Sequence, residues 1–139
     1  MASIHFYTEK ITFKIPSPRK TVNWLNAICL LEKRELGSLI YVFCSDKFLL
    51  ELNKQYLGHK TYTDILSFDY GEGKKVEGEI YISISRVREN ARNYGQVFDV
   101  ELRRVIAHGL LHFLGYRDKK SSEKVQMRRK EEACLSLWK

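Results

Sequence analysis

Cysteine is scarce in this sequence, and the three cysteines follow no recognisable spacing. Cys29, Cys44 and Cys134 are odd in number and far apart in the chain, and they form no C-x-x-C pair. This excludes a disulfide-rich secreted scaffold and argues against a cysteine-based redox site. We expect three buried thiols in a protein that works in a reducing compartment.

Long apolar runs are also absent. No stretch approaches the roughly 20 apolar residues of a membrane-spanning helix, and the opening MASIHFYTEK lacks the apolar segment of a signal peptide. We therefore expect a cytoplasmic protein with no membrane contact. The chain has 139 residues, which is enough for one domain with a hydrophobic core of its own. We expect a single domain over residues 1–139.

Acidic residues are outnumbered by basic ones. The 17 Asp and Glu against 24 Lys and Arg give a formal net charge of +7, which favours a polyanionic partner such as nucleic acid. Arg86 and Arg104 lie in two of the basic stretches, and we take them as candidate RNA-binding residues. The alternative is that these stretches are simply solvated faces of helices.

Hydrophobic spacing predicts strands and helices mixed along the chain. Helical spacing follows Ser17 and Pro18, a cap and first-turn pair, and we expect that helix to end near Gly37. Asp46 is a candidate cap for a second helix. The remaining predictions are a strand or hairpin in 3–14, strands in 39–45, 64–70 and 78–84, and helices in 85–96, 100–115 and after 122. This order predicts an α/β or α+β protein with a small sheet packed by helices.

The helix predicted over 100–115 is apolar around nearly all of its circumference, which is typical of a central, buried helix. Its narrow polar stripe carries Glu101, His108 and His112. Unpartnered imidazoles in a protein core are unfavourable. Something must therefore satisfy both histidines.

A metal ion would satisfy them. His108 and His112 are one helical turn apart, so both side chains can reach one ion. Gly115 can adopt the left-handed conformation that turns the chain back after a helix, and this would bring Asp118 to the same point. Three protein ligands leave a fourth zinc position open for water, as in catalytic sites. The sequence predicts one Zn²⁺ per chain, bound by His108, His112 and Asp118.

The spacing H-x-x-x-H-x-x-G-x-x-D is shared with zinc peptidases, apart from the third ligand. Those enzymes place a glutamate directly after the first histidine as the general base, and here that position is Gly109. Peptidase chemistry is therefore not supported. Glu101 lies about 10 Å along the helix axis from His108, so we expect it to be an outer residue and identify no general base.

Three motifs make the sequence resemble the YbeY family of metal-dependent endoribonucleases and rRNA maturation factors. HGLLHFLGYRD (108–118) resembles the family's H-G-x-L-H-L-x-G-Y-D-H. LNKQYLGHKTYTDILSF (52–68) and GEIYIS (78–83) resemble two further motifs, in the same order and at similar spacing. The resemblance implies an α+β domain with a metal-holding cleft. It also implies single-stranded RNA substrates and a role in small-subunit 16S rRNA 3′ end processing and ribosome quality control, with small-subunit ribosomal proteins or assembly factors as partners.

The sequence departs from the family pattern at three positions. Asp118 replaces the third metal-binding histidine, and carboxylate oxygen is also a zinc ligand. Leu57 replaces an arginine suited to a phosphate, and Tyr62 replaces a proline. Lys60, close to Leu57 in sequence, is our candidate for a substitute catalytic cation.

The resemblance leaves two alternatives open. The chain could be a non-catalytic ribosome-assembly factor that binds rRNA with its basic faces and holds a structural metal. It could also be a hydrolase of another substrate, such as a peptidase, against which Gly109 argues. Metal-dependent cleavage of RNA separates the first alternative from an endoribonuclease.

Overall fold

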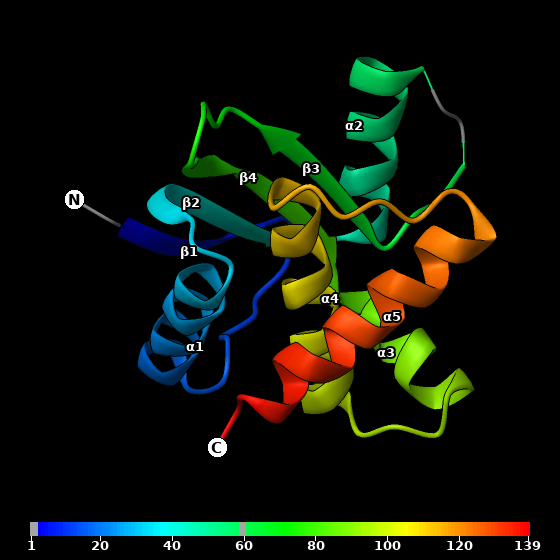
Figure 1. Ribbon diagram of the computed structural model, residues 1–139. Coiled ribbons are helices and arrows are strands. Elements are labelled where there is room, and N and C mark those ends of the chain that lie inside the picture. The colour runs from blue at the N-terminus through cyan, green and yellow to red at the C-terminus, as the bar shows by residue number, and fades with distance from the viewer. Residues whose placement is uncertain (1–2, 59–60) are drawn as a thin grey trace.

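The structure, a computed structural model, describes residues 3–58 and 61–139. Within these ranges the chain forms four strands and five helices: β1 (Ser3–Glu9), α1 (Pro18–Leu31), β2 (Glu35–Cys44), α2 (Asp46–Leu57), β3 (Ile65–Asp69), β4 (Lys75–Ser83), α3 (Ile84–Asn93), α4 (Phe98–Phe113) and α5 (Ser121–Ser136) (Figure 1). The predicted α+β class is confirmed. Among the described residues, no helix combines the length and apolarity needed to cross a membrane.

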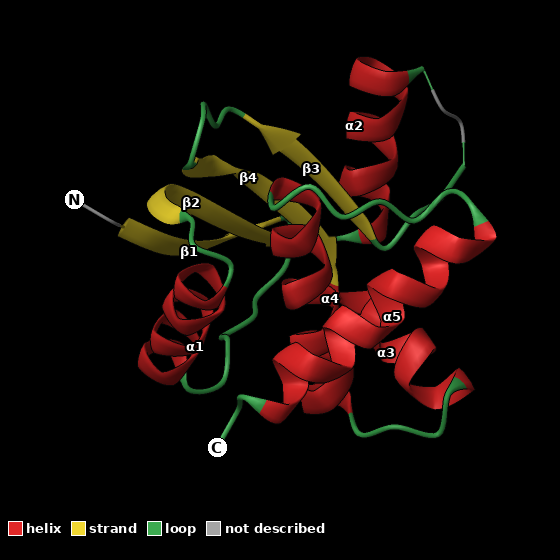
Figure 2. Ribbon diagram, in the orientation of Figure 1, coloured by secondary structure: helices red, strands yellow, loops and turns green. Residues whose placement is uncertain are grey.

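The strands form one mixed sheet in the order β1-β2-β4-β3. β1 and β4 both run parallel to β2, whereas β3 runs antiparallel to β4. In Figure 2 the helices lie on both sides of this sheet, with α4 next to it and α5 crossing over α4. The fold therefore places α4 between the sheet and another helix, as expected for a central helix.

The two faces of the sheet carry cores of different size. Alternate residues of the central strands, such as Tyr41, Phe43 and Ile80, join α1 and α4 in the main core. A smaller cluster around Leu49 and Leu66 lies where α2 covers the opposite face. The predicted metal ligands belong to the helix of the larger core.

α4 approaches β4 closely because each element contributes a glycine at the contact. A Cβ atom on Gly109 would lie 3.0 Å from two side-chain carbons of Ile80. In the opposite direction, a Cβ atom on Gly78 would lie 2.6 Å from the ring of Phe113. A side chain larger than a methyl group at either position would have no room between the helix and the sheet.

Two local predictions were wrong. The first helix ends at Leu31, and Gly37 lies inside β2, because β2 begins several residues before the apolar run that predicted it. The N-cap of α2 is Ser45, whose side chain accepts a hydrogen bond from the Phe48 amide, and Asp46 is the first helical residue. For the segment 3–14, where a strand or a hairpin was predicted, the strand is confirmed: β1 covers Ser3–Glu9 and pairs with β2.

Candidate metal centre

The C-terminus of α4 turns as predicted at Gly115. This residue has a φ of 102°, a conformation that favours glycine. The Gly115 amide donates to the His112 carbonyl, and the Tyr116 amide donates to the Leu111 carbonyl, which is the hydrogen-bond pattern of a Schellman motif. The motif reverses the chain so that Asp118 lies beside the last turns of the helix.

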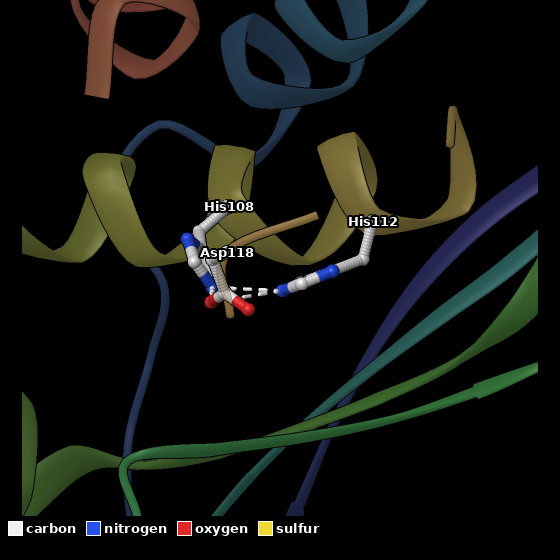
Figure 3. A group of neighbouring side chains, drawn as sticks. All are labelled: His108, His112 and Asp118. Atoms are coloured by element: carbon white, nitrogen blue, oxygen red, sulfur yellow. Dashed lines mark hydrogen bonds and ion pairs between the residues drawn. The ribbon is translucent and has the colours of Figure 1, made fainter. Parts of the chain in front are cut away.

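The three predicted ligands meet at one point (Figure 3). Oδ2 of Asp118 lies 3.2 Å from Nε2 of His108 and 3.4 Å from Nε2 of His112, and the two Nε2 atoms are 3.0 Å apart. Donors bound to zinc at about 2.0–2.1 Å in a tetrahedron are about 3.3 Å apart. The spacing of the three atoms therefore fits one face of a tetrahedral zinc site, and these residues form a group able to hold a metal ion.

A fourth residue, Glu131 of α5, orients the first histidine. Its Oε2 lies 2.6 Å from Nδ1 of His108, and its side chain is almost fully buried. A carboxylate accepts a hydrogen bond and cannot donate one, so the proton of the neutral imidazole is held on Nδ1 and Nε2 is left free to bind metal. Arg104 Nη1 lies 3.4 Å from Oε1 of Glu131 and supports the carboxylate from behind.

The two histidines have opposite pKa shifts. Burial alone would lower the pKa of His108, but the hydrogen bond and charge of Glu131, together with the charge of Asp118, raise it above the usual value. Burial and the neighbouring His108 lower the pKa of His112, and Asp118 offsets only part of this. The difference follows from the single carboxylate of Glu131, which contacts one imidazole of the pair.

Gly109 lies about 100° around α4 from His108 and about 60° from His112. Its Cα faces Ile80 and Ile65 of the sheet. A glutamate at this position would have no room against these two side chains. The missing peptidase base thus has a structural reason, because the helix needs a glycine there to pack on β4.

Of the two predicted RNA-binding arginines, Arg104 is 9% exposed and pairs with Glu101, Glu131 and Glu132. Contact between Arg104 and RNA would require it to give up these pairs, so the structure gives it a supporting place behind the metal ligands. Arg86 forms two hydrogen bonds with Asp46 and stacks on the ring of Tyr62. Contact of either arginine with RNA therefore stays a prediction.

Residues near the end of α2 are placed only in part. Leu57 is the last residue of that helix and is exposed. The candidate catalytic Lys60, with its neighbour His59, lies outside the described residues.

Two adjoining hollows open beside the metal group, with volumes of about 390 and 290 Å³. Both are lined by Tyr94, His108, Asp118, Arg128 and Glu131. Glu101 lines the smaller one; it is 3% exposed, and its Oε1 accepts no hydrogen bond from any described residue. Burial raises the pKa of this carboxyl.

The importance of Glu131 was missed at the level of sequence. It lies 23 residues beyond His108 in the chain, on a helix that we predicted only from its tail position. A signal was present, because Met127, Glu131 and Cys134 follow helical spacing and are all buried. A carboxylate on an otherwise apolar stripe needs a buried partner, and the histidines were available.

Comparisons with known proteins place this chain among relatives that share one name. A family model described as "Endoribonuclease YbeY" matches residues 4–139. The protein of that name from Flavobacterium psychrophilum is 45% identical over 132 residues, covering 95% of this chain and 94% of the relative. The one from Cytophaga hutchinsonii is 46% identical over 138 residues, covering 99% and 96%. The solution structure of a Thermotoga maritima protein is 28% identical, with a TM-score of 0.64 over 97% of this chain and 88% of the other.

Proposed function

Because the chain belongs to the YbeY endoribonuclease family, we propose that it is a zinc-dependent endoribonuclease, a hydrolase that cleaves phosphodiester bonds in single-stranded RNA. The observation that carries this proposal is the spacing of the three donor atoms of His108, His112 and Asp118. The whole of residues 1–139 would form this one hydrolase domain.

The residues around the site have separate parts in the proposed reaction. Bound zinc would supply a Lewis acid and an activated water at its open position. His108 and His112 would hold the ion through Nε2, and Asp118 would add a negative charge that moderates its Lewis acidity. Glu131 keeps the proton of His108 on Nδ1, and Arg104 holds the Glu131 carboxylate in place. Leu57 supplies no positive charge for the RNA, so we expect slow cleavage of naked RNA.

In the cell, we place this activity in the cytoplasm, in the processing of rRNA and in ribosome biogenesis. The substrate would be the 3′ end of small-subunit 16S rRNA, with a further part in ribosome quality control. Small-subunit ribosomal proteins or assembly factors would bring the enzyme to its substrate. The excess of Lys and Arg, +7 at neutral pH, supports a partner rich in phosphate.

The test combines metal content and RNA cleavage in one purified sample. His112→Ala removes one ligand, so we expect loss of bound zinc and of cleavage of a labelled single-stranded RNA. His5→Ala is the matched control, because His5 is an exposed histidine of β1 and should change neither. Asp118→His should retain zinc, since imidazole also binds this ion. Full zinc content in His112→Ala would show that the site is elsewhere.

The second candidate function is a non-catalytic ribosome-assembly factor with a structural metal. The observation that favours it is the uncharged Leu57, which leaves the RNA one cation fewer. This protein would bind rRNA with the same metal content but would cleave no RNA before or after treatment with a chelator. Chelator-sensitive cleavage, absent in His112→Ala, would decide for the enzyme.

A further inference from the structure

Three basic residues of α5, Lys124, Arg128 and Arg129, form no ion pair with a described acidic residue. Within residues 3–58 and 61–139, the ion pairs of α5 are made by Lys130, Glu131 and Glu132. Lys124 and Arg128 take part in none, although both are exposed. They lie one helical turn apart, so their side chains point from the same side of α5.

Both of these residues line the 390 Å³ hollow that also contains His108 and Asp118. Arg128 lines the smaller hollow as well. Burial raises the pKa of Glu101, and the charges of Arg104 and Arg128 partly offset that rise. The positive charge of Arg128 therefore acts at the inner end of the cavity as well as at its rim.

An aromatic side chain completes the same wall. Tyr94, directly after α3, is 59% exposed and lines both hollows. The exposed ring of Tyr94 is therefore open to contact by a ligand that enters either hollow. Exposed aromatic rings next to cations are the elements with which proteins bind single-stranded nucleic acid, because bases stack on the ring while the cations follow the phosphates.

Most acidic residues of the cavity already have polar partners among the described residues. Glu131 accepts a hydrogen bond from His108 and pairs with Arg104, and the Asp118 carboxylate lies against both metal-binding imidazoles. Asp64 accepts a hydrogen bond from Asn90. Arg128 and Lys124 thus remain available to an anion that enters from solvent.

We propose that Tyr94, Lys124 and Arg128 form a nucleotide subsite next to the metal, in which Arg128 and Lys124 hold an RNA phosphate and Tyr94 stacks on the adjoining base. This inference rests on the proposed function, because it assigns the substrate's path to the metal centre. It places one unpaired nucleotide between α3 and α5. A base inside a duplex cannot stack on the ring, so the subsite gives a reason for single-strand preference.

The test compares Arg128→Ala with Arg129→Ala. Arg129 is the next residue on the same helix and is also exposed, but it lines only an outer hollow that lacks the metal ligands. The zinc-loaded protein would be titrated on ice with a fluorescein-labelled oligouridylate. A parallel cleavage assay would show that the RNA stays intact during the titration. We expect Arg128→Ala to weaken binding about tenfold or more and to lower the salt slope by about 0.7, with a much smaller change for Arg129→Ala.

The tyrosine is tested by two substitutions. Tyr94→Leu should weaken binding roughly 5- to 100-fold, the range for loss of one base stack, whereas Tyr94→Phe keeps the ring and should bind normally. Equal losses for Arg128→Ala and Arg129→Ala, or unchanged binding by Tyr94→Leu, would overturn the subsite. If the unmodified chain binds RNA but does not cleave it, the proposed function fails while these comparisons still decide the subsite. Absence of RNA binding by the unmodified chain would overturn both.

Discussion

Two sides of α4 face different surroundings, one the sheet and the other α5. The side toward the sheet is apolar and so closely packed that Gly109 carries no side chain against Ile80. The side toward α5 carries His108 and Arg104, whose charges and protons are matched by carboxylates of α5. Two adjacent residues thus have different roles: His108 is a candidate metal ligand, and Gly109 allows close packing on the sheet.

This comparison shows that the chemistry of the site depends on which side of the helix a residue occupies, more than on its distance from the ligands in sequence. Position 109 is next to a ligand and yet belongs to the packing of the sheet. Position 131 is remote in sequence and yet contacts that ligand at 2.6 Å. The predictions below test each side in turn.

The largest effect is expected on the sheet side. Gly109→Glu would place a carboxylate against Ile80 and Ile65, where it has neither room nor a partner, and should lower the free energy of unfolding by about 4 kcal/mol or more. Urea denaturation followed by circular dichroism measures this. Gly109→Ala is the matched control and should lose much less, because side-chain atoms of isoleucine can move slightly. A stable Gly109→Glu protein would refute the close packing of α4 on β4.

On the other side, the expected effect is on metal affinity. Glu131→Gln should weaken zinc binding about 10- to 100-fold, as is typical when the hydrogen-bond partner of a ligating histidine is altered. Glu132→Gln is the control, since Glu132 pairs with Arg104 but not with His108. Competition with a chromophoric chelator measures the affinity, and the visible absorption of the cobalt form reports the geometry. Equal affinity of the two variants would remove Glu131 from the site.

The same variant should change how zinc binding depends on pH. A protonated His108 cannot bind the ion, and its pKa lies above the usual value because of Glu131 and Asp118, against the effect of burial. Zinc affinity of the unmodified protein should therefore decline as pH falls through that raised pKa. In Glu131→Gln the decline should begin at lower pH. Chelator competition across a pH series would show whether the two curves differ in this direction.

The smallest effect is expected at Glu101, at the start of the polar side. Its folded-state pKa is raised by burial, so the folded protein binds this proton more tightly than the unfolded chain does. Stability therefore decreases as pH rises from the unfolded to the folded pKa. Glu101→Gln should gain up to about 1 kcal/mol at neutral pH, and the gain should vanish in acid. A gain that persists in acid would show that charge is not its cause.

Sequence reasoning recovered the parts of the site that are local. Helix geometry places His108 and His112 one turn apart. The conformation of one glycine, Gly115, reverses the chain and brings Asp118 to them. Glu131 was not predicted, because its partner is set by how α5 crosses α4. The same tertiary contact placed Arg104 among carboxylates instead of in solvent.

In the fold, too, the local features were predicted and those set by tertiary contacts were not. The central helix and the small sheet followed from hydrophobic spacing, since burial on all sides leaves a clear record in sequence. The end of α1 and the pairing of β1 were missed. β1 pairs with β2, which lies beyond α1 in the chain, so its partner could not be read from the neighbouring residues.

The place of Glu131 near the end of the described chain sets an order of events during synthesis. A ribosome finishes His108 and His112 before it makes α5, so the imidazole of His108 waits without the carboxylate that fixes its proton. A chain in which α5 has not yet packed on α4 should bind zinc more weakly. On the proposed function, cutting activity would therefore follow the docking of α5 on α4.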